Sequence, residues 1–376
     1  MNKVAILTQP LHTNFGGTLQ AYALQNVLME IGCEVETINY RKADNTNFRK
    51  MLSLLKNFLK KQRENYPFFK GEQLVREKNH SKFIKNNISL SVEINDSEEL
   101  YNYIKSNNFN NIIIGSDQVW RKSYSPNIND FFFEFIEHDK EICKITYAAS
   151  FGLNHWEYST KETEYLKKLI CNINNISVRE CSAVDLCKKH LNVDVKLVLD
   201  PTLLLTKEDY IRNFNLKKIE NKKGIFKYIL DSNACSEVTL THVADKLDKK
   251  IFSEQPKKIV REGLFLFDIE NYVYPSIESW LNAFYSADYI VTDSFHGSVF
   301  SIIFNKPFIA IVNKDRGASR FESLFNLLGL SERLIYDDTL INEKILCLDM
   351  NYTEINQKLE NLRVDSLKWL IESLKF

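Results

Sequence analysis

The first forty residues constrain the fold more than any other part of the chain. Residues 3–7 are an apolar strand, and residues 8–17 are a loop containing proline, asparagine and two glycines. Apolar residues at helical spacing follow over residues 18–31, Gly32 ends that helix, and residues 35–39 form a second strand. A strand–loop–helix–strand unit of this kind predicts a parallel, doubly wound α/β sheet.

Alternating strands and helices recur along the rest of the chain, in two sets separated by a polar stretch at residues 205–223. The length of 376 residues is enough for two hydrophobic cores. We therefore expect an N-terminal Rossmann-like domain over residues 1–205, a C-terminal one over 206–350 and a final helix over 351–376. The predicted strands are residues 111–114, 144–148, 176–178, 196–199, 226–230, 289–292 and 308–312, and the predicted helices are 157–170, 180–190, 237–247, 277–287 and 297–304.

Charge and composition argue against several classes of partner. Lysine plus arginine equals aspartate plus glutamate at 49 each, which predicts no nucleic-acid partner. No apolar run approaches the roughly 20 residues that cross a bilayer, and the first residues lack the pattern of a signal peptide. The seven cysteines are scattered and never spaced Cys-x-x-Cys, so we expect reduced thiols in a cytoplasmic protein.

One segment departs from this charge balance. Residues 41–87 hold 13 lysines and arginines against 4 acidic residues, with apolar residues at helical spacing. This pattern predicts a basic helical insert in the first domain, with a solvated charged face. The alternative is a surface that contacts anionic lipid or a lipid-diphosphate substrate at the inner face of the cytoplasmic membrane. Flotation with anionic vesicles separates the two interpretations, because only the second predicts binding.

Polar residues follow several predicted strands, at the sheet edge where doubly wound folds bind ligands. Asn14 and Gly16 precede the first helix, where backbone N–H groups can approach an anion, although a plain tight turn explains them equally well. Ser116 and Asp117 follow the strand 111–114, where they either present a site or cap a helix.

Two further strand ends carry residues suited to anion binding and proton transfer. Arg179 ends the strand 176–178, where burial requires an anionic partner, either Glu180 or a substrate carboxylate or phosphate. His296 lies between the strand 289–292 and the start of the next predicted helix. A histidine in that position suits proton transfer near neutral pH.

The loop after the strand 308–312 adds further cations. Arg316 and Arg320 are placed to contact an anion there, although a solvated loop also explains them. The sequence contains no Gly-x-Gly-x-x-Gly fingerprint, Walker loop, Gly-x-Ser-x-Gly elbow or His-Glu-x-x-His. These absences argue against a nucleotide-dependent dehydrogenase, a P-loop kinase, an α/β-hydrolase and a zincin.

Taken in order, these clusters resemble the polysaccharide pyruvyltransferase family. The resemblance spans nearly the whole chain and rests on seven ordered blocks. The blocks are Asn14-Phe15-Gly16 with residues 19–25 (LQAYALQ), and then residues 115–120 (GSDQVW), 147–152 (YAASFG), 177–180 (SVRE), 200–204 (DPTLL), 292–298 (TDSFHGS) and 320–321 (RF).

The resemblance implies a GT-B-like architecture, in which two Rossmann-like, doubly wound domains face a central cleft and the last helix returns to the first domain. It also implies phosphoenolpyruvate as donor and a sugar of a surface polysaccharide or lipid-linked repeat unit as acceptor. The product would be a pyruvate ketal, with release of phosphate. Neither a metal nor an organic cofactor is implied. The acceptor sugar, the geometry of the ketal and the oligomeric state stay open.

The family's chemistry suggests roles for the residues in these motifs. Arg179 is expected to bind one anionic group of the donor and to be catalytic, and His296 to be the general acid or base. The expected donor-binding residues are Arg179, Ser294, Gly297, Ser298 and Arg320, and the expected acceptor or cleft residues are Asn14, Gly16, Ser116 and Asp117.

Two other functions fit the same architecture. A glycosyltransferase that uses a nucleotide sugar would share the two-domain fold, and thermal-shift screening of phosphoenolpyruvate against nucleotide sugars separates the two enzymes. A non-catalytic glycan-binding relative would usually have lost Arg179 or His296.

Overall fold

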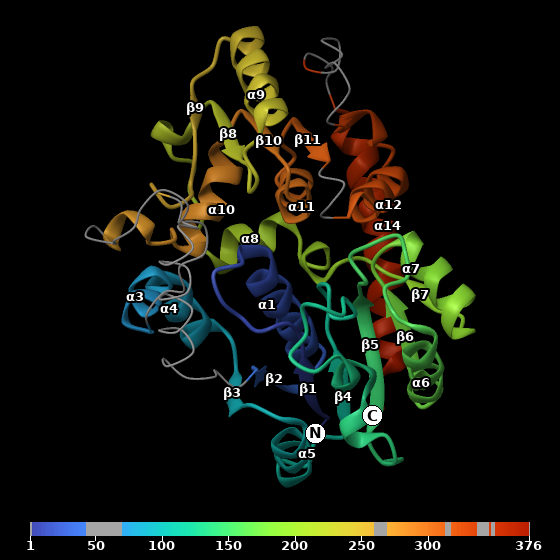
Figure 1. Cartoon of the computed structure of the whole chain (residues 1–376). Helices are drawn as coiled ribbons and strands as arrows, with labels where there is room; N and C mark the ends of the chain where they lie inside the picture. The colour runs from blue at the N-terminus through green and yellow to red at the C-terminus, as the bar shows by residue number, and fades with distance from the viewer. Residues whose placement is uncertain are drawn as a thin grey trace, which may run out of the picture.

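The computed structural model describes residues 2–42, 70–258, 269–312, 317–336, 346 and 350–375. Within these residues the chain forms two parallel sheets with helices on their faces, one sheet above the other in Figure 1. The predicted α/β class is therefore confirmed. Residues 43–69 of the basic segment and Arg316 lie outside the described residues.

The N-terminal sheet brings the first strand-end loops side by side. In the described chain its strand order is β3-β2-β1-β4-β5-β6-β7, and all pairs are parallel. The chain therefore changes direction across the sheet between β1 and β4, a switch point of the kind outside which such sheets bind ligands. The strands are β1 (Lys3–Leu7), β2 (Glu34–Tyr40), β3 (Leu90–Ile94), β4 (Asn111–Ile114), β5 (Cys143–Ala149), β6 (Asn175–Val178) and β7 (Lys196–Leu197).

The C-terminal sheet is also parallel and also has a switch point, with fewer described strands. Its order is β12-β11-β10-β8-β9, again parallel, so its own switch point lies between β8 and β10. The strands are β8 (Ile225–Tyr228), β9 (Ile251–Phe252), β10 (Tyr289–Thr292), β11 (Phe308–Val312) and β12 (Leu334–Tyr336).

Helices connect the strands of both sheets. None of the helices in the described ranges is long and apolar enough to cross a membrane. The α-helices are α1 (Phe15–Glu30), α3 (Lys70–Arg76), α4 (Lys78–Asn87), α5 (Ser97–Ser106), α6 (Thr160–Ile170), α7 (Cys181–Leu186), α8 (Lys207–Asn213), α9 (Ala234–Leu247), α10 (Ile277–Ser286), α11 (Phe295–Ile303), α12 (Ala318–Leu328) and α14 (Tyr352–Ser373).

Helices α1, α9 and α11 begin two or three residues earlier than the sequence pattern predicts, because polar side chains cap them. The Asn14 side chain accepts a hydrogen bond from the Gly17 N–H at 3.1 Å, so α1 already begins at Phe15. Ser294 caps α11 in the same way through the Gly297 N–H at 3.4 Å. Because of these caps, the residues that directly follow Asn14 and Ser294 already belong to the first helical turn.

The two domains share one continuous apolar core. Helix α1 is buried on nearly all sides, because it packs on its own sheet and also faces the second domain. Its Phe15 ring stacks on Trp280 of α10, with ring centroids 4.9 Å apart. Removing so much apolar surface from water favours a fixed arrangement of the two domains.

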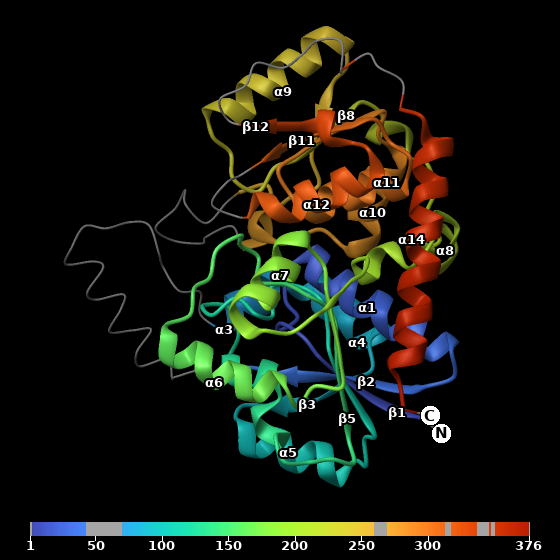
Figure 2. The ribbon, with the colours of Figure 1, turned by 90° about the vertical axis from the view of Figure 1, so that its right-hand side faces the viewer.

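Helix α14 runs along the side of both domains, as Figure 2 shows. Its C-terminal half lies against the N-terminal sheet. Ser366 accepts a hydrogen bond from the Leu199 N–H at 3.0 Å, and Trp369 packs on Tyr147 of β5. Just beyond the helix, the Lys375 N–H donates to Asn111 of β4 at 2.9 Å.

The described end of the basic segment bridges the two domains. Residues 70–87 form α3 and α4. The Tyr274 N–H of the second domain donates to the Arg76 carbonyl at 3.0 Å, and Asn79 donates to the Tyr274 carbonyl at 2.8 Å. Helices α3 and α4 therefore contact the second domain directly, in addition to carrying charged residues.

His80 of α4 makes the fold sensitive to acid. Its ring is buried against Phe15 and Tyr274, and burial, together with the nearby His12, lowers its pKa from 6.5 to about 4. Below pH 6.5 the unfolded chain takes up a proton that the folded chain does not accept until about pH 4. The neutral ring therefore contributes about 3 kcal/mol to the free energy of unfolding above pH 6.5. This contribution is lost as the pH falls towards 4.

We therefore expect His80→Phe to flatten the dependence of the free energy of unfolding on pH between 6.5 and 4. Urea unfolding at a series of pH values measures it. The exposed His155→Phe is the matched control, and equal acid sensitivity in His80→Phe and the wild type would contradict the assignment.

Candidate active site

A cavity of about 470 Å³ opens where the switch points of the two sheets face each other. Asn14 and Asp117 line it from the N-terminal domain, at the ends of β1 and β4, and Tyr228 and Asp293 line it from the C-terminal domain, at the ends of β8 and β10. Cationic side chains outnumber carboxylates in its described lining. The cations are Arg76, Arg121, Lys258 and Arg320, and the carboxylates are Asp117 and Asp293. This excess favours an anionic ligand.

Helices α1 and α11 both begin at this cavity. Phe15 of α1 and both Phe295 and His296 of α11 line it. These residues occupy the first turn of their helices, where N–H groups have no intrahelical acceptor and the helix dipole is positive. Two helix starts that converge on one cavity make a strong site for phosphate or carboxylate.

The two helix starts touch through Gly16 and His296. A Cβ atom added to Gly16 would lie 2.0 Å from Nδ1 of the His296 ring. The His296 ring can therefore occupy its position only because Gly16 has no side chain. The sequence suggested a cleft role for Gly16, and its observed role is to admit the imidazole.

We expect Gly16→Ala to lower turnover at least 100-fold without unfolding the protein, because the added methyl group must displace the His296 ring. Gly71→Ala on α3 is the matched control, since a Cβ there meets nothing within 4 Å. Steady-state rates and thermal unfolding of both variants give the comparison, and wild-type turnover in Gly16→Ala would show that the ring need not occupy this position.

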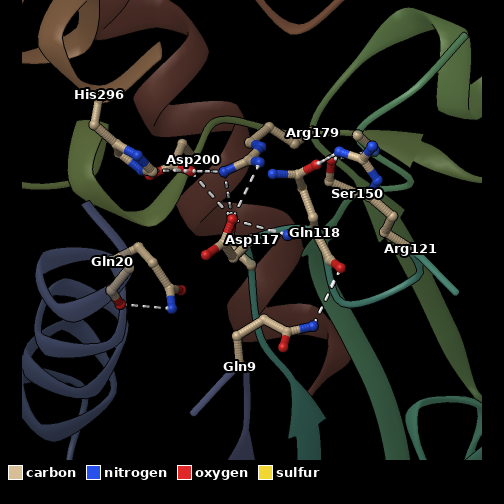
Figure 3. A network of polar contacts seen from close by, with 12 residues as sticks. Gln9, Gln20, Asp117, Gln118, Arg121, Ser150, Arg179, Asp200 and His296 are labelled. Carbon is tan, nitrogen blue, oxygen red and sulfur yellow. Dashed lines mark hydrogen bonds and ion pairs between the residues drawn. The ribbon is translucent and has the colours of Figure 1, made fainter. Parts of the chain in front are cut away.

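Asp200 is the centre of a buried network beneath the cavity. Its carboxylate accepts hydrogen bonds from Arg179 Nη1 at 2.6 Å, from Ser116 Oγ at 3.1 Å and from Thr202. His296 Nε2 lies 3.6 Å from the same carboxylate. Figure 3 shows His296 reaching Asp200 from one side and Arg179 from the other. Burial alone would raise the pKa of Asp200, but His296, Arg179 and Thr202 hold this pKa well below its usual range.

Arg179 has a different environment from the one expected. Its side chain is 2% exposed and does not line the cavity. Besides Asp200, it lies 3.8 Å from Glu180 and 3.9 Å from Asp117, and its guanidinium packs over the Phe295 ring. The charge that was expected to meet a donor anion is matched by protein carboxylates. This placement favours a positioning role, in which Arg179 fixes Asp200 and through it His296.

Glu180 holds a neighbouring loop in place. Its carboxylate accepts hydrogen bonds from the Ser150 hydroxyl at 2.8 Å and from the Phe151 N–H at 3.1 Å. Burial raises the pKa of Glu180, against the opposing charge of Arg179. The loop continues to Gly152, whose carbonyl oxygen would be 1.8 Å from a Cβ on Gly317, the residue before α12. The loop therefore packs closely against the start of α12.

Arg320 lies in the first turn of α12 and lines the cavity. Its guanidinium is 5.7 Å from the centre of the Phe295 ring. Burial, and the nearby charge of Arg179, lower the pKa of Arg320 to about 10, so it is still cationic at neutral pH. Glu180 and Asp117 oppose this shift. Arg320 lines the cavity and Arg179 does not, so Arg320 is the better placed of these two arginines to bind a ligand.

The other predicted residues divide into two groups. Asn14, Asp117 and Ser294 line the cavity, whereas Ser116 lies beneath it in the Asp200 network. Asp117 has a positive φ of 82°, an uncommon backbone state for a residue other than glycine, which directs its carboxylate at this strand end.

The proposed role of Gly297 and Ser298 needs correction. Their N–H groups are bonded to the side chain and the carbonyl of Ser294, so they are not available to a ligand. Phe295 and His296, two residues earlier in the same first turn, line the cavity.

Sequence reasoning missed several cavity residues. Arg121 lies close enough to the Gly115–Asp117 turn that a cavity position could have been predicted for it. Arg76 could not be distinguished from the other cations of the basic segment. Tyr228 and Lys258 carried no local signal, because only the packing of the two domains brings them to the cavity. Among the described residues no cluster of histidine, cysteine, aspartate and glutamate is arranged to hold a metal ion.

Comparison with solved structures identifies the architecture. The structure matches UGT89C1 of Arabidopsis thaliana complexed with UDP-L-rhamnose, with a TM-score of 0.52 at 10% identity over 98% of both chains. It also matches a ugt transferase from Siraitia grosvenorii in complex with UDP, with a TM-score of 0.50 at 8% identity over 99% of both chains. At these identities the likeness shows the fold, which is the predicted GT-B arrangement.

Comparison at the level of sequence identifies the family. No curated protein matches the chain. The model of the family described as polysaccharide pyruvyl transferase matches residues 14–315, a range that contains the strand-end motifs up to β11. The chain belongs to the polysaccharide pyruvyl transferase family.

Proposed function

We propose that this protein transfers the enolpyruvyl unit of phosphoenolpyruvate to a sugar of a surface polysaccharide or lipid-linked repeat unit. The product is a pyruvate ketal, and phosphate is released. Family membership supports transferase chemistry on polysaccharides. The observation that carries the donor assignment is the meeting of two helix starts and Arg320 at one cavity.

Phosphoenolpyruvate has two anionic groups, and the cavity offers positive groups for both. Arg320 can hold one group through paired N–H donors, which suit a carboxylate or a phosphate. The first N–H groups of α1 and α11 suit the other. Arg320 comes from the C-terminal domain, so donor binding at this point spans the domain interface.

Ketal formation needs two proton movements and no change of oxidation state. Two acceptor hydroxyls form bonds to the central carbon of the donor, and the bond from that carbon to the phosphate oxygen breaks. One hydroxyl proton ends on the terminal methylene, which becomes a methyl group, and the other leaves with phosphate. His296 lines the cavity beside Asp200, which orients its ring, so we assign these proton transfers to His296.

The acceptor is proposed to enter from the N-terminal side of the cavity. Asn14 and Asp117 line that side, and a carboxylate there can accept a hydrogen bond from a sugar hydroxyl. We further propose that the reaction takes place in the cytoplasm, at the inner membrane face when the acceptor is lipid-linked. It is proposed to require neither metal nor organic cofactor.

A turnover assay tests this function. Purified protein is incubated with phosphoenolpyruvate, EDTA and bacterial surface oligosaccharides, and released phosphate and the mass of the glycans are measured. The proposal requires phosphate release that depends on a glycan, together with an acid-labile pyruvate ketal on that glycan. Transfer of a sugar from a nucleotide donor, without any reaction of phosphoenolpyruvate, would identify the glycosyltransferase alternative instead.

A further inference from the structure

One aromatic side chain of the 470 Å³ cavity has no role in donor binding as proposed. Tyr124 lies in the loop after β4, lines the cavity and is 50% exposed. The other phenylalanine and tyrosine rings of the described lining are buried or half-buried. They are Phe15, Tyr228, Tyr274, Phe295 and Phe321. Tyr124 is therefore the ring of this lining that offers a ligand the largest exposed fraction.

Arg121 covers one face of the Tyr124 ring. Its guanidinium carbon lies over the ring, 4.4 Å from the ring centre, and its Nη1 donates a hydrogen bond to the Tyr124 hydroxyl at 3.0 Å. The same nitrogen donates to Gln118 Oε1 at 3.0 Å, and Figure 3 shows these two side chains together. The exposed surface of Tyr124 is therefore the face turned away from Arg121.

Hydrogen bonds fix the loop that carries Tyr124. The Tyr124 N–H donates to the Arg121 carbonyl at 3.0 Å. The Ser125 hydroxyl donates to the Val119 carbonyl at 2.7 Å. Gln9 of the loop after β1 donates in turn to the Ser125 hydroxyl at 2.8 Å. A ring that is already fixed loses little conformational entropy when a ligand stacks on it, which favours binding.

Tyr124 lies on the side of the cavity that is proposed for the acceptor. The same loop carries Asp117, which also lines the cavity. Arg320 and the start of α11, which are proposed for the donor, come from the C-terminal domain. A ligand on Tyr124 therefore approaches the donor from the opposite domain.

The exposed ring face suits a sugar. A pyranose has C–H bonds on its ring faces and hydroxyl groups around its edge, so one face can stack on an aromatic ring while the hydroxyls pair with polar groups. Nucleobases also stack on aromatic side chains. Membership of the polysaccharide pyruvyl transferase family favours the sugar over the nucleobase.

We propose that Tyr124 is the stacking platform for the pyranose ring that receives pyruvate, and that Arg121 positions it. The acceptor sugar must then present one face formed by C–H bonds. This inference rests on the proposed function for the role of the bound sugar, but the stacking of a sugar on Tyr124 can be measured separately.

Saturation-transfer NMR tests the platform, because it reports which protons of a sugar touch the protein. The probes are the methyl β-pyranosides of glucose, galactose, mannose and N-acetylglucosamine, together with bacterial surface oligosaccharides. Calorimetric titrations with phosphoenolpyruvate and with UDP-glucose are run separately. Tyr124→Ala removes the ring, and Tyr124→Phe keeps it. Tyr124→Leu, which has apolar bulk without a flat face, replaces Tyr124→Ala if that variant is unstable.

Tyr101→Ala is the matched control. Tyr101 lies on α5, is 42% exposed and is absent from the described lining of the cavity. We expect the wild type, Tyr124→Phe and Tyr101→Ala to bind the same glycan, with saturation strongest at the C–H protons of one ring face. Tyr124→Ala should bind that glycan at least about tenfold more weakly, as expected for loss of an aromatic anchor, and should bind phosphoenolpyruvate with unchanged affinity.

Four results would overturn the platform. They are unchanged glycan binding in Tyr124→Ala, an equal loss in Tyr124→Phe, no glycan binding by the wild type, and binding of UDP-glucose that Tyr124→Ala abolishes. Any of the first three, with normal phosphoenolpyruvate binding, would leave the donor assignment intact. Weaker glycan binding in Tyr124→Ala, in a protein that never binds phosphoenolpyruvate, would refute the donor assignment and keep the platform.

Discussion

Replacing His296 with asparagine is expected to lower kcat by about 10²–10⁴-fold, the range for loss of a general acid or base. The ring lies in the first turn of α11, lines the cavity and is 3.6 Å from Asp200. Asparagine is smaller and polar, so it fits beside Gly16 without forcing the two helix starts apart. The variant should therefore fold and still bind phosphoenolpyruvate, and phosphate release at saturating donor and acceptor measures the loss.

The exposed His155→Asn is the control for His296→Asn and should have wild-type turnover. Two results would contradict the proton-transfer role. Near-normal kcat in His296→Asn would remove it altogether. Loss of phosphoenolpyruvate binding with little change in kcat would mean that His296 holds the donor and does not move a proton.

Replacing Arg320 with methionine is expected to weaken phosphoenolpyruvate binding by roughly 10–150-fold. Hydrogen bonds to a charged group contribute about 1.5–3 kcal/mol, which corresponds to this range of dissociation constants. Methionine keeps apolar contact with Phe295 and removes the positive charge. Calorimetric titration measures the dissociation constant, and the exposed Arg212→Met is the matched control.

Arg179→Met separates the two buried arginines. Because Arg179 lies among Asp200, Glu180 and Asp117, its loss leaves buried carboxylates unpaired and should lower the free energy of unfolding by about 3–5 kcal/mol. Urea unfolding measures this change. An Arg179→Met protein of normal stability that fails to bind phosphoenolpyruvate would instead support the role expected from the sequence, a direct contact with the donor.

Local patterns were sufficient to predict the main elements of the fold. Apolar runs followed by polar turns located β1, β4 and β10 within a residue of their observed bounds, because these strands are fully or almost fully buried. The edge strands β3, β9 and β12 were missed, since each is only two to five residues long and partly buried. The start of α11 was placed too late, because the capping bond of Ser294 was not anticipated.

The candidate site was only partly predictable, for a physical reason. Strand ends and helix starts are local features, so His296, Asp117 and Arg320 could be found in the sequence. The partner of Arg179 is Asp200, 21 residues away on another loop, and the contact between Gly16 and His296 joins two domains. Such pairings depend on how the sheets pack, and local spacing does not encode them.

The most direct test of the account is a calorimetric titration of phosphoenolpyruvate into the wild-type protein, with UDP-glucose titrated in parallel. The account predicts saturable binding of phosphoenolpyruvate at one site for each chain, weakened as stated in Arg320→Met, and no binding of UDP-glucose. Saturable binding of UDP-glucose with none of phosphoenolpyruvate would contradict it, and would assign the cavity to a nucleotide-sugar donor.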